Sequence, residues 1–486
     1  MTHPAIARVG ALLKTSALVG GHWLAHATRF EVRDPANGQL LAEVSNLDAH
    51  EADRAINIAA NALPVWRNST ANERSAILRR WYELILEHRE TLAVLITAEQ
   101  GKPLAEARGE VVYAASFVEW FAEEARRIYG DIIPSPSNDR RALVLRQAIG
   151  VCAAITPWNF PAAMLTRKIA PALAAGCTIL LKPAEQTPLT ALALADLAMQ
   201  AGMPAGVFNV LTADGRNSVA IGKRLCEHPQ VRHLSFTGST EVGRLLMAQC
   251  APTLKRMSLE LGGNAPFIVF DDADIDAAVD GALFAKYRNA GQTCVCANRF
   301  IVQAGVHDEF VARLAERSAQ IRVGHGFEEG VQQGPLIDDV AVAKFMHHLD
   351  DARRKGARLH VGGVAPKGRF VAPTVLSQVN TDMLVAREET FGPLSAVMKF
   401  SDEEEAIALA NASESGLAAY FYTRDISRVW RMAEALECGM VGINTGAISY
   451  ASMPFGGVKQ SGFGREGSRY GIDEYVDLKY LCMAGL

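Results

Sequence analysis

The amino-acid sequence predicts an α/β protein with two lobes, each built on a doubly wound parallel sheet. From residue 143 onward, short strand-like apolar runs alternate with helical stretches, and a second alternation of this kind follows Met257. Such alternation is typical of βαβ units, whose helices cover both faces of a parallel sheet. A chain of 486 residues is also too long for one core, since domains average roughly 150 residues. We therefore expect clefts between lobes and a ligand beyond the carboxyl ends of the strands.

Two helical segments precede the first sheet. Residues 71–100 carry apolar side chains at helical spacing and are followed by Gly101, a typical residue after a helix end. We interpret them as one amphipathic helix. A second helix is predicted at 104–128, before Gly130. The next residues, 131–136, include two prolines and predict an extended segment at a domain boundary.

The predicted elements of the two sheets follow in order. In the first lobe, strands are predicted at 144–156, 178–184, 207–213 and 231–238, and helices at 189–201 and 241–251. In the second lobe, strands are predicted at 266–270 and 439–445, and helices at 274–285 and 308–319. The C-terminal residues 475–483 alternate like a strand but have no obvious local partner, and we predict that they pair with another subunit.

Composition and charge argue against several classes of protein. The formal net charge is −4 at pH 7 with both signs interspersed, so no broad positive field exists for a nucleic-acid backbone. The N-terminal segment lacks a basic stretch followed by an apolar run, and the most apolar stretch, 150–181, is broken by prolines and charged residues. Eight scattered cysteines form no disulfide framework. We expect a soluble cytoplasmic protein.

Cys294 is the candidate nucleophile. It lies in the loop-like sequence NAGQTCVCANR, between a predicted helix and a predicted strand. A cysteine in an apolar setting is more often an inert packing residue, by roughly three or four to one, because free cysteine is among the most buried side chains. The neighbouring motifs have to decide between these two interpretations.

Seven short motifs together resemble the aldehyde dehydrogenase family, and they stand in the family's order. They are TPWNFP at 156–161, LKPAEQTP at 181–188, FTGSTEVG at 236–243, LELGG at 259–263, GQTC at 291–294, EETFGP at 388–393 and PFGG at 454–457. Seven strings in this order leave little room for coincidence. The roles below are therefore carried over one residue at a time.

The resemblance covers nearly the whole chain and implies three structural parts. They are a coenzyme-binding domain at 1–128 and 148–258, a catalytic domain at 259–462, and a small β arm for oligomerisation at 129–147 and 463–486. The family forms dimers and tetramers, so the resemblance also implies a homo-oligomer.

The resemblance implies a catalytic set of three residues. An aldehyde has no leaving group, so its oxidation needs a nucleophile whose adduct releases hydride to nicotinamide, and Cys294 matches this nucleophile. Asn159 matches the donor to the oxyanion, alongside the Cys294 backbone amide, and Glu260 matches the base that activates water to hydrolyse the thioester. The alternatives are an asparagine that only shapes a turn and a glutamate on the exposed side of a strand.

Coenzyme binding also rests on the resemblance, because no GxGxxG fingerprint follows a strand. The matching residues are Thr156, Pro157, Trp158, Lys182, Glu185, Gly238, Ser239, Glu389 and Phe391. Residues 238–239 match a pyrophosphate site at a helix N-terminus, although a plain N-cap serine has the same sequence pattern. Glu185 predicts NAD rather than NADP, since a carboxylate that accepts from a ribose 2′-hydroxyl repels a 2′-phosphate. Some members with this glutamate use both, so NADP stays possible.

Within the family, the chain is most similar to succinate-semialdehyde dehydrogenases, through residues 160–177, 287–299 and the C-terminal segment. Arg167 and Arg288 match two arginines that bind the substrate carboxylate, and Ser449 matches the accompanying hydroxyl donor. A small-molecule semialdehyde, succinate semialdehyde first, is therefore the expected substrate.

Three alternatives to this substrate assignment stay open. Each arginine could be a solvated helix residue. Tyr450 and Met453 lie in the segment that departs most from these relatives, so glutarate semialdehyde or another small aliphatic aldehyde is a rival; one methylene distinguishes substrates by only ~1–3 kcal/mol. A nucleotide-binding protein that kept the fold without activity is the rival from another class.

Two smaller expectations concern the other cysteines and metals. Cys296 lies two residues after Cys294, and some succinate-semialdehyde dehydrogenases join such a pair in a reversible disulfide, whereas a small packing residue is an equal alternative. No metal site is predicted, since the histidines form no HExxH pair and two close thiols are too few for structural zinc.

Overall fold

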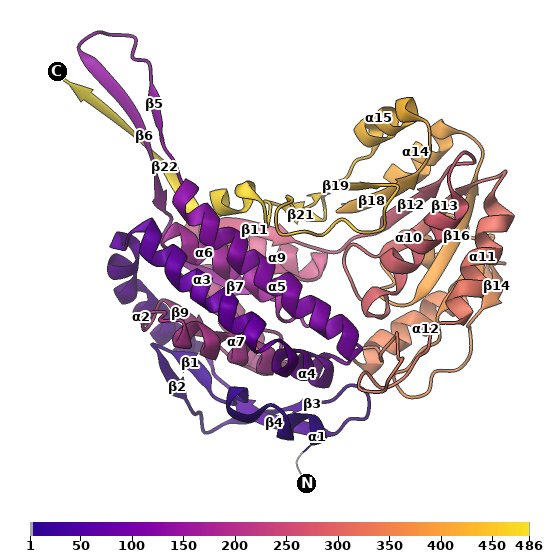
Figure 1. Ribbon diagram of the computed structural model, residues 1–486, viewed down its shortest axis with the longest axis horizontal. Helices are drawn as coiled ribbons and strands as arrows, with labels where there is room; N and C mark the ends of the chain where they lie inside the picture. The colour runs from indigo at the N-terminus through magenta and orange to yellow at the C-terminus, as the bar shows by residue number, and fades with distance from the viewer. Residues whose placement is uncertain (1–2, 486) are drawn as a thin grey trace.

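The computed structural model describes residues 3–485 and has two lobes with a projecting arm (Figure 1). The first lobe contains an eight-stranded sheet of order β2-β1-β9-β8-β7-β10-β11-β21, whose five strands from β9 to β11 are parallel. Its strands are β1 (Ala17–Val19), β2 (His22–Leu24), β7 (Val151–Ile155), β8 (Thr178–Lys182), β9 (Phe208–Val210), β10 (Val231–Thr237), β11 (Arg256–Glu260) and β21 (Gly462–Phe463). The strands predicted at 178–184, 207–213 and 231–238 are present as β8, β9 and β10. The single strand predicted at 144–156 is wrong, because the chain breaks at Gly150, whose φ is 138°: residues up to Ala148 belong to β6 (Arg140–Ala148) in another sheet, and β7 begins at Val151.

The second lobe contains a seven-stranded sheet of order β14-β15-β16-β13-β12-β18-β19, parallel except for β14. Its strands are β12 (Ala265–Val269), β13 (Ala297–Gln303), β14 (Arg358–Val361), β15 (Thr374–Ser377), β16 (Leu394–Phe400), β18 (Ala418–Tyr422) and β19 (Met440–Ile443). Along β12, Phe267 and Val269 enter one core while Ile268 enters the other. This two-sided burial is why the strand is a continuous apolar run.

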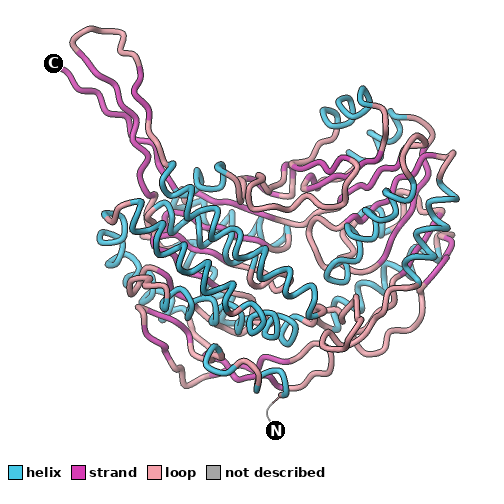
Figure 2. Tube along the Cα trace, in the orientation of Figure 1, coloured by secondary structure: helices cyan, strands magenta, loops and turns pink. Residues whose placement is uncertain are grey.

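Helices cover both faces of each sheet, and Figure 2 shows the strands between them. On the first sheet, α2 and α8 pack on one face and α6 and α7 on the other, with α3, α4 and α5 outside them. The helices of this lobe are α1 (Pro4–Ala7), α2 (Ala49–Asn68), α3 (Ala71–Glu87), α4 (Arg89–Gln100), α5 (Leu104–Glu124), α6 (Ala163–Ala175), α7 (Pro188–Gln200), α8 (Gly215–Glu227) and α9 (Thr240–Cys250). Those of the second are α10 (Ile275–Tyr287), α11 (His307–Ala319), α12 (Asp339–Arg354), α13 (Leu384–Arg387), α14 (Glu403–Asn411) and α15 (Ile426–Ala435). Within residues 3–485, no helix has the length and apolarity to cross a membrane.

Two predictions about helices are corrected by the structure. Residues 71–100 form two helices, α3 and α4, that meet at His88, whose φ of −95° and ψ of 18° interrupt the helix. Both helices bury apolar side chains in the same core, so the apolar spacing continues through the break. The second difference is a set of helices that the sequence analysis did not include, among them α2, α6, α8 and α12. In α6, Pro171 lies inside the helix and obscures the helical pattern.

The C-terminal strand has a partner within its own chain. β22 (Val476–Ala484) pairs antiparallel with β6 (Arg140–Ala148) along its whole length, and β6 also pairs with β5 (Asp131–Ile133). These three strands form the arm that leaves the body in Figure 1. The sequence shows no local partner for β22 because β6 lies more than 300 residues away along the chain, and local patterns cannot show such pairing; pairing with another subunit stays a prediction.

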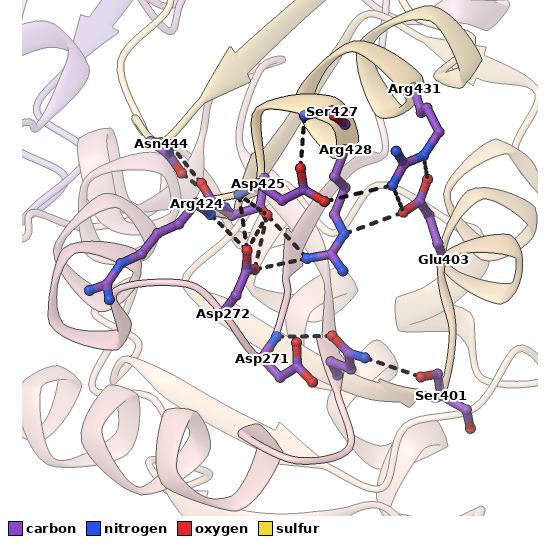
Figure 3. A network of polar contacts seen from close by, with 12 residues as sticks. Asp271, Asp272, Ser401, Glu403, Arg424, Asp425, Ser427, Arg428, Arg431 and Asn444 are labelled. Carbon is purple, nitrogen blue, oxygen red and sulfur yellow. Dashed lines mark hydrogen bonds and ion pairs between the residues drawn. The ribbon is translucent and has the colours of Figure 1, made fainter.

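Each sheet has a point where the strand order reverses. In the first sheet it lies between β7 and β10, where ligands of doubly wound folds bind. In the second sheet the reversal point lies between β12 and β18, where groups of the chain itself form a network of polar contacts (Figure 3). There Asp272 accepts hydrogen bonds from the Thr423 hydroxyl, from two backbone amides and from Arg428. The reversal point of the first sheet is therefore the better place for a ligand.

Asp272 is expected to stabilise the second lobe in a pH-dependent way. Burial raises its pKa, but hydrogen bonds from Thr423 and the Arg424 amide outweigh burial and hold the pKa below its usual range. Asp272→Ala should therefore cost about 1–3 kcal/mol of unfolding free energy near pH 7. A carboxylate whose pKa is depressed in the folded state stabilises the fold at pH values above its unfolded-state pKa. The loss of unfolding free energy in Asp272→Ala should therefore shrink as the pH falls through the folded-state pKa of Asp272. Urea unfolding of Asp272→Ala and the parent protein at several pH values measures this difference in unfolding free energy.

The neighbouring aspartate provides the matched control. The carboxylate of Asp271 accepts no hydrogen bond within the described part of the chain, and only its backbone amide is engaged, by Gln303. Asp271→Ala should leave the unfolding midpoint nearly unchanged. Equal midpoints for the two variants would show that the Asp272 contacts contribute nothing.

Candidate active site

Cys294 lies in a short loop between α10 and β13. Before it, Asn289 and Ala290 adopt left-handed conformations with φ of 51° and 57°, which turn the chain sharply after α10. The Cys294 side chain is partly exposed. Gly263, from the LELGG motif, lies so close that a Cβ there would stand 2.3 Å from the Cys294 carbonyl oxygen. The glycine therefore lets the strand carrying Glu260 approach the nucleophile loop.

The Cys294 thiol needs activation. Burial raises its pKa to about 12, and the positive charge of Arg167 only partly opposes this shift. The thiolate is the nucleophilic form of cysteine. A base is consequently needed to remove the proton at neutral pH.

Glu260 ends β11 and is buried, with 1% of its surface exposed. Neither carboxylate oxygen has a hydrogen-bond partner within residues 3–485, although buried polar atoms normally have one. Gly456, from the PFGG motif, borders the carboxylate, since a Cβ there would stand 2.9 Å from Oε1. Burial raises the Glu260 pKa well above its usual value, and Glu466 raises it further. Such a group suits proton transfer with a water molecule.

A buried group of charges lies beside Glu260. Arg167 and Lys168 on α6 both pair with Glu466, and Lys168 also donates to Ser235 at 2.9 Å. The positive charges of Arg167 and Lys168 lower the Glu260 pKa against the effect of burial. Sequence reasoning missed Lys168 and Glu466. Their only signal was a set of charged residues within otherwise apolar or glycine-rich segments.

Asn159 follows β7 and reaches the loop of Cys294. Its side-chain nitrogen donates to the Gln292 carbonyl at 3.0 Å. An amide nitrogen carries two hydrogens, so one N–H stays available for an oxyanion. The carbonyl of Asn159 accepts from Lys102 and Asn289, two residues that the sequence analysis did not include.

A pocket of about 840 Å³ opens beside the nucleophile loop. Thr293 and Val295, which flank Cys294, line it together with Arg288 and Ser449. The guanidinium carbon of Arg288 lies 4.7 Å from the centroid of the Phe160 ring, with Tyr113 and Phe284 within 6.0 Å. Arg288 forms no ion pair within residues 3–485, although its charge acts on a neighbouring carboxyl: burial raises the pKa of Glu106 in the same pocket, and Arg288 partly opposes this rise. A positive charge held by rings without a direct ion pair suits an anionic group of a substrate.

Arg167 is buried beside Tyr113, a residue of this pocket's lining on which the charge of Arg288 also acts. It does not line this pocket, is 1% exposed, and is already paired with Glu466. Its charge nevertheless acts on both Cys294 and Glu260. Arg288 and Ser449 thus line the pocket directly, while a role of Arg167 toward the substrate carboxylate stays a prediction.

Four residues predicted to bind the coenzyme lie at or just after strand ends of the first sheet, around its reversal point: Thr156, Lys182 and Glu185, the last two predicted for the adenosine ribose, and Ser239, predicted for the pyrophosphate. Thr156 directly follows β7, and its amide donates to Lys182 at the end of β8. Lys182 pairs with Glu185 at 3.1 Å. Ser239 is the N-cap of α9 and accepts from the Val242 amide. The free amides of the first turn of α9 favour an anionic group at this position.

The residues predicted for the nicotinamide end lie near the nucleophile loop. Burial raises the Glu389 pKa to about 7. One Glu389 oxygen accepts from the Gly263 amide at 3.1 Å, and the other accepts no hydrogen bond within the described residues, so it is available to a ribose hydroxyl. The Trp158 and Phe391 rings meet edge to face, with centroids 5.7 Å apart. These residues fit a dinucleotide that extends from Ser239 towards Cys294.

The surroundings of Cys296 are those of a packed thiol rather than of a free, reactive one. It is buried, and its sulfur lies within hydrogen-bond reach of the carbonyls of Lys286 and Ala297. This position agrees with a packing role, while the disulfide with Cys294 stays a prediction. Within residues 3–485, no group of three or more histidine, cysteine or acidic side chains is arranged to hold a metal.

The fold and these motifs define an enzyme class. A model of the aldehyde dehydrogenase family matches residues 23–481, and the chain belongs to this family of oxidoreductases. It is 58% identical to a succinate-semialdehyde dehydrogenase [NADP(+)] of Escherichia coli (strain K12) over 97% of this chain and 98% of the relative. It is also 58% identical to a glutarate-semialdehyde dehydrogenase of Pseudomonas putida over 97% and 98%. A 3-sulfolactaldehyde dehydrogenase of Pseudomonas putida is 57% identical over 98% of each chain.

Solved structures confirm the predicted fold. An aldehyde dehydrogenase from Brucella melitensis biovar abortus 2308 superimposes with a TM-score of 0.97 at 59% identity, covering 98% of this chain and 99% of the other. The two lobes and their sheets are therefore those of the family. Because the similar enzymes differ in the aldehyde they are named for, the comparisons establish a dehydrogenase of semialdehyde type but leave its particular substrate open.

Proposed function

We propose that this enzyme oxidises a small aldehyde with an anionic far end to the corresponding acid, with succinate semialdehyde as the first candidate. The single observation that carries the proposal is Arg288, a cation that forms no ion pair in the described chain and is held by aromatic rings in a pocket that flanks Cys294. Carboxylate and sulfonate groups both accept hydrogen bonds from a guanidinium fork. Ser449 supplies a hydroxyl in the same pocket.

The chemistry follows from the chain's own residues. The Cys294 thiol passes its proton to a water molecule that acts as the base. Its sulfur attacks the aldehyde carbon to form a thiohemiacetal, whose oxyanion accepts hydrogen bonds from Asn159 and the Cys294 amide. A bound NAD(P) supplies the hydride acceptor. Loss of hydride leaves a thioester on Cys294, and Glu260 takes a proton from the water that attacks the thioester carbonyl. The acid then leaves and the Cys294 thiol is restored.

Steady-state NADH and NADPH formation tests this function. The substrates are succinate semialdehyde, glutarate semialdehyde and an uncharged aldehyde of similar length, each with NAD and with NADP. The proposal expects kcat/KM for a semialdehyde to exceed that for the uncharged aldehyde, and succinate semialdehyde to be the better of the two. If the uncharged aldehyde reacts as efficiently, the anion pocket is refuted and only the family mechanism stands.

Removing the Arg288 charge should weaken substrate binding selectively. Arg288→Met keeps much of the side-chain length but loses a charge-assisted contact of about 1.5–3 kcal/mol, so KM for the semialdehyde should rise about 10- to 100-fold. KM for the uncharged aldehyde should stay nearly constant. Arg317→Met is the matched control, because Arg317 lines the same pocket but is paired with Asp280. Equal effects of Arg288→Met on both aldehydes would contradict a role in carboxylate binding.

We propose NAD as the preferred coenzyme, with NADP possible. The Glu185 carboxylate lies just after the end of β8, beside Gly215 at the start of α8, where a 2′-phosphate would meet its negative charge. Lys182 pairs with this carboxylate and so moderates the repulsion. The assay above decides between the coenzymes: a larger kcat/KM with NADP would exclude the interpretation of Glu185.

We propose that the arm joins subunits in a homo-oligomer. We also propose that the first lobe binds the coenzyme and the second carries the catalytic cysteine, at the domain boundaries predicted above. The arm exposes several large apolar side chains, which an oligomer could cover: Ile132, Leu145, Leu478, Tyr480 and Met483. β22 lies at the edge of the arm sheet, and an edge strand is a ready site for pairing with another chain. The location in the cytoplasm also stays a proposal.

A further inference from the structure

The backbone carbonyl of Asn159 is held by two side-chain donors. Lys102 donates to it at 2.8 Å and Asn289 at 2.9 Å. Both donors are buried, with at most 2% of their surface exposed. Lys102 is in turn paired with Glu110 on α5 at 2.5 Å. The main chain at the predicted oxyanion donor is therefore fixed from two sides.

Asn289 also contacts the loop that carries the nucleophile. The same side-chain nitrogen lies 3.2 Å from the Gln292 carbonyl, which accepts from Asn159 as well. The backbone amide of Asn289 donates to Glu106 on α5 at 2.9 Å. The Asn289 carboxamide thus links the carbonyl of the oxyanion donor to a carbonyl two residues before Cys294.

The conformation of Asn289 restricts which residue can make this link. Its φ of 51° lies in the left-handed region, which asparagine, aspartate and glycine adopt more readily than other residues. Of these three, only asparagine has a side-chain N–H donor. Aspartate at this position would place an acceptor against two carbonyl oxygens.

We propose that Asn289 is a positioning residue that sets the Asn159 carboxamide relative to the Cys294 sulfur. The inference rests on the proposed function of Asn159 and deepens it. A donor displaced by about 1 Å from the oxyanion can cost about 100-fold in rate. Asn289 contacts no reacting atom, so its proposed effect reaches the reaction through Asn159.

The test is a double-mutant cycle on the first turnover. In the full-length enzyme, Asn289→Asp should slow the burst of NADH from a semialdehyde about 10- to 100-fold, with KM changed less than about two-fold and a larger isotope effect when the aldehyde hydrogen is deuterium. In the Asn159→Ala background, the same substitution should have almost no further effect, since the group that it positions is absent. Asn289→Gly, which keeps the backbone conformation but removes the donor, should be intermediate.

Controls separate positioning from a loss of structure. Asn411→Asp removes a comparable amide that donates to the Ala435 carbonyl in the second lobe, and it should leave the burst rate unchanged. Alkylation of Cys294 by iodoacetamide should proceed at the parent rate in Asn289→Asp, because the thiol is still presented. The proposal is overturned if Asn289→Asp and Asn289→Gly keep the parent burst rate, or if their effects multiply with that of Asn159→Ala. Failure of the parent enzyme to oxidise any semialdehyde would instead refute the proposed function.

Discussion

Cys294→Ala is expected to lower kcat/KM for a semialdehyde by at least about 10⁴-fold, the scale observed when a covalent nucleophile is removed. Without the sulfur, no thiohemiacetal forms, and hydride has no tetrahedral adduct from which to leave. Coenzyme binding should be retained, since none of the predicted coenzyme contacts involves the Cys294 side chain. Steady-state NADH formation and a coenzyme titration by tryptophan fluorescence measure the two properties.

Cys482→Ala is the matched control for the nucleophile. Cys482 is an exposed thiol on β22 in the arm. Its replacement should leave kcat/KM unchanged, whereas Cys294→Ser should lose nearly as much activity as Cys294→Ala because a hydroxyl is far less acidic than a thiol. If Cys294→Ala kept more than about a tenth of the parent activity, the covalent mechanism would be refuted.

Glu260→Gln is expected to separate the two halves of the reaction. The first turnover should still release about one NADH per active site, and the steady-state rate should then fall about 10²- to 10⁴-fold, because no base activates the hydrolytic water. In the parent enzyme this rate should rise with pH, since burial raises the Glu260 pKa and only the carboxylate accepts a proton. The glutamine variant should lose that dependence.

A chemical rescue makes the Glu260 experiment specific. Hydroxylamine cleaves thioesters without help from a base, so it should restore turnover to Glu260→Gln. If the burst and the steady state fell by the same factor and hydroxylamine had no effect, Glu260 would act before the thioester forms.

The sequence predicted the fold class and the catalytic motifs better than it predicted contacts between them. Motifs such as LELGG and GQTC are local, and local patterns place Glu260 at a strand end and Cys294 in a loop. The position of Arg167 depended on Glu466, far away in the sequence, and no local pattern reveals that partner. From the sequence Arg167 therefore looks equivalent to Arg288, whereas the structure pairs Arg167 with Glu466 and places Arg288 in the lining of the pocket.

The same limit explains the other differences. The partner of β22 is distant along the chain, and a break at His88 does not disturb the apolar spacing that predicts a helix. Asn289 and Lys102 are polar residues in unremarkable positions of the sequence. Only the folded chain shows that both donate to one carbonyl oxygen.

The thioester on Cys294 is tested most directly by trapping it. Glu260→Gln is mixed with succinate semialdehyde and NAD, quenched in acid within the burst, digested and measured by mass spectrometry. We expect the mass of one succinyl group on the peptide that contains Cys294, and its loss after treatment with hydroxylamine. A full NADH burst with no acyl group on that peptide, or with the group on another cysteine, would contradict the assignment of Cys294 as the nucleophile.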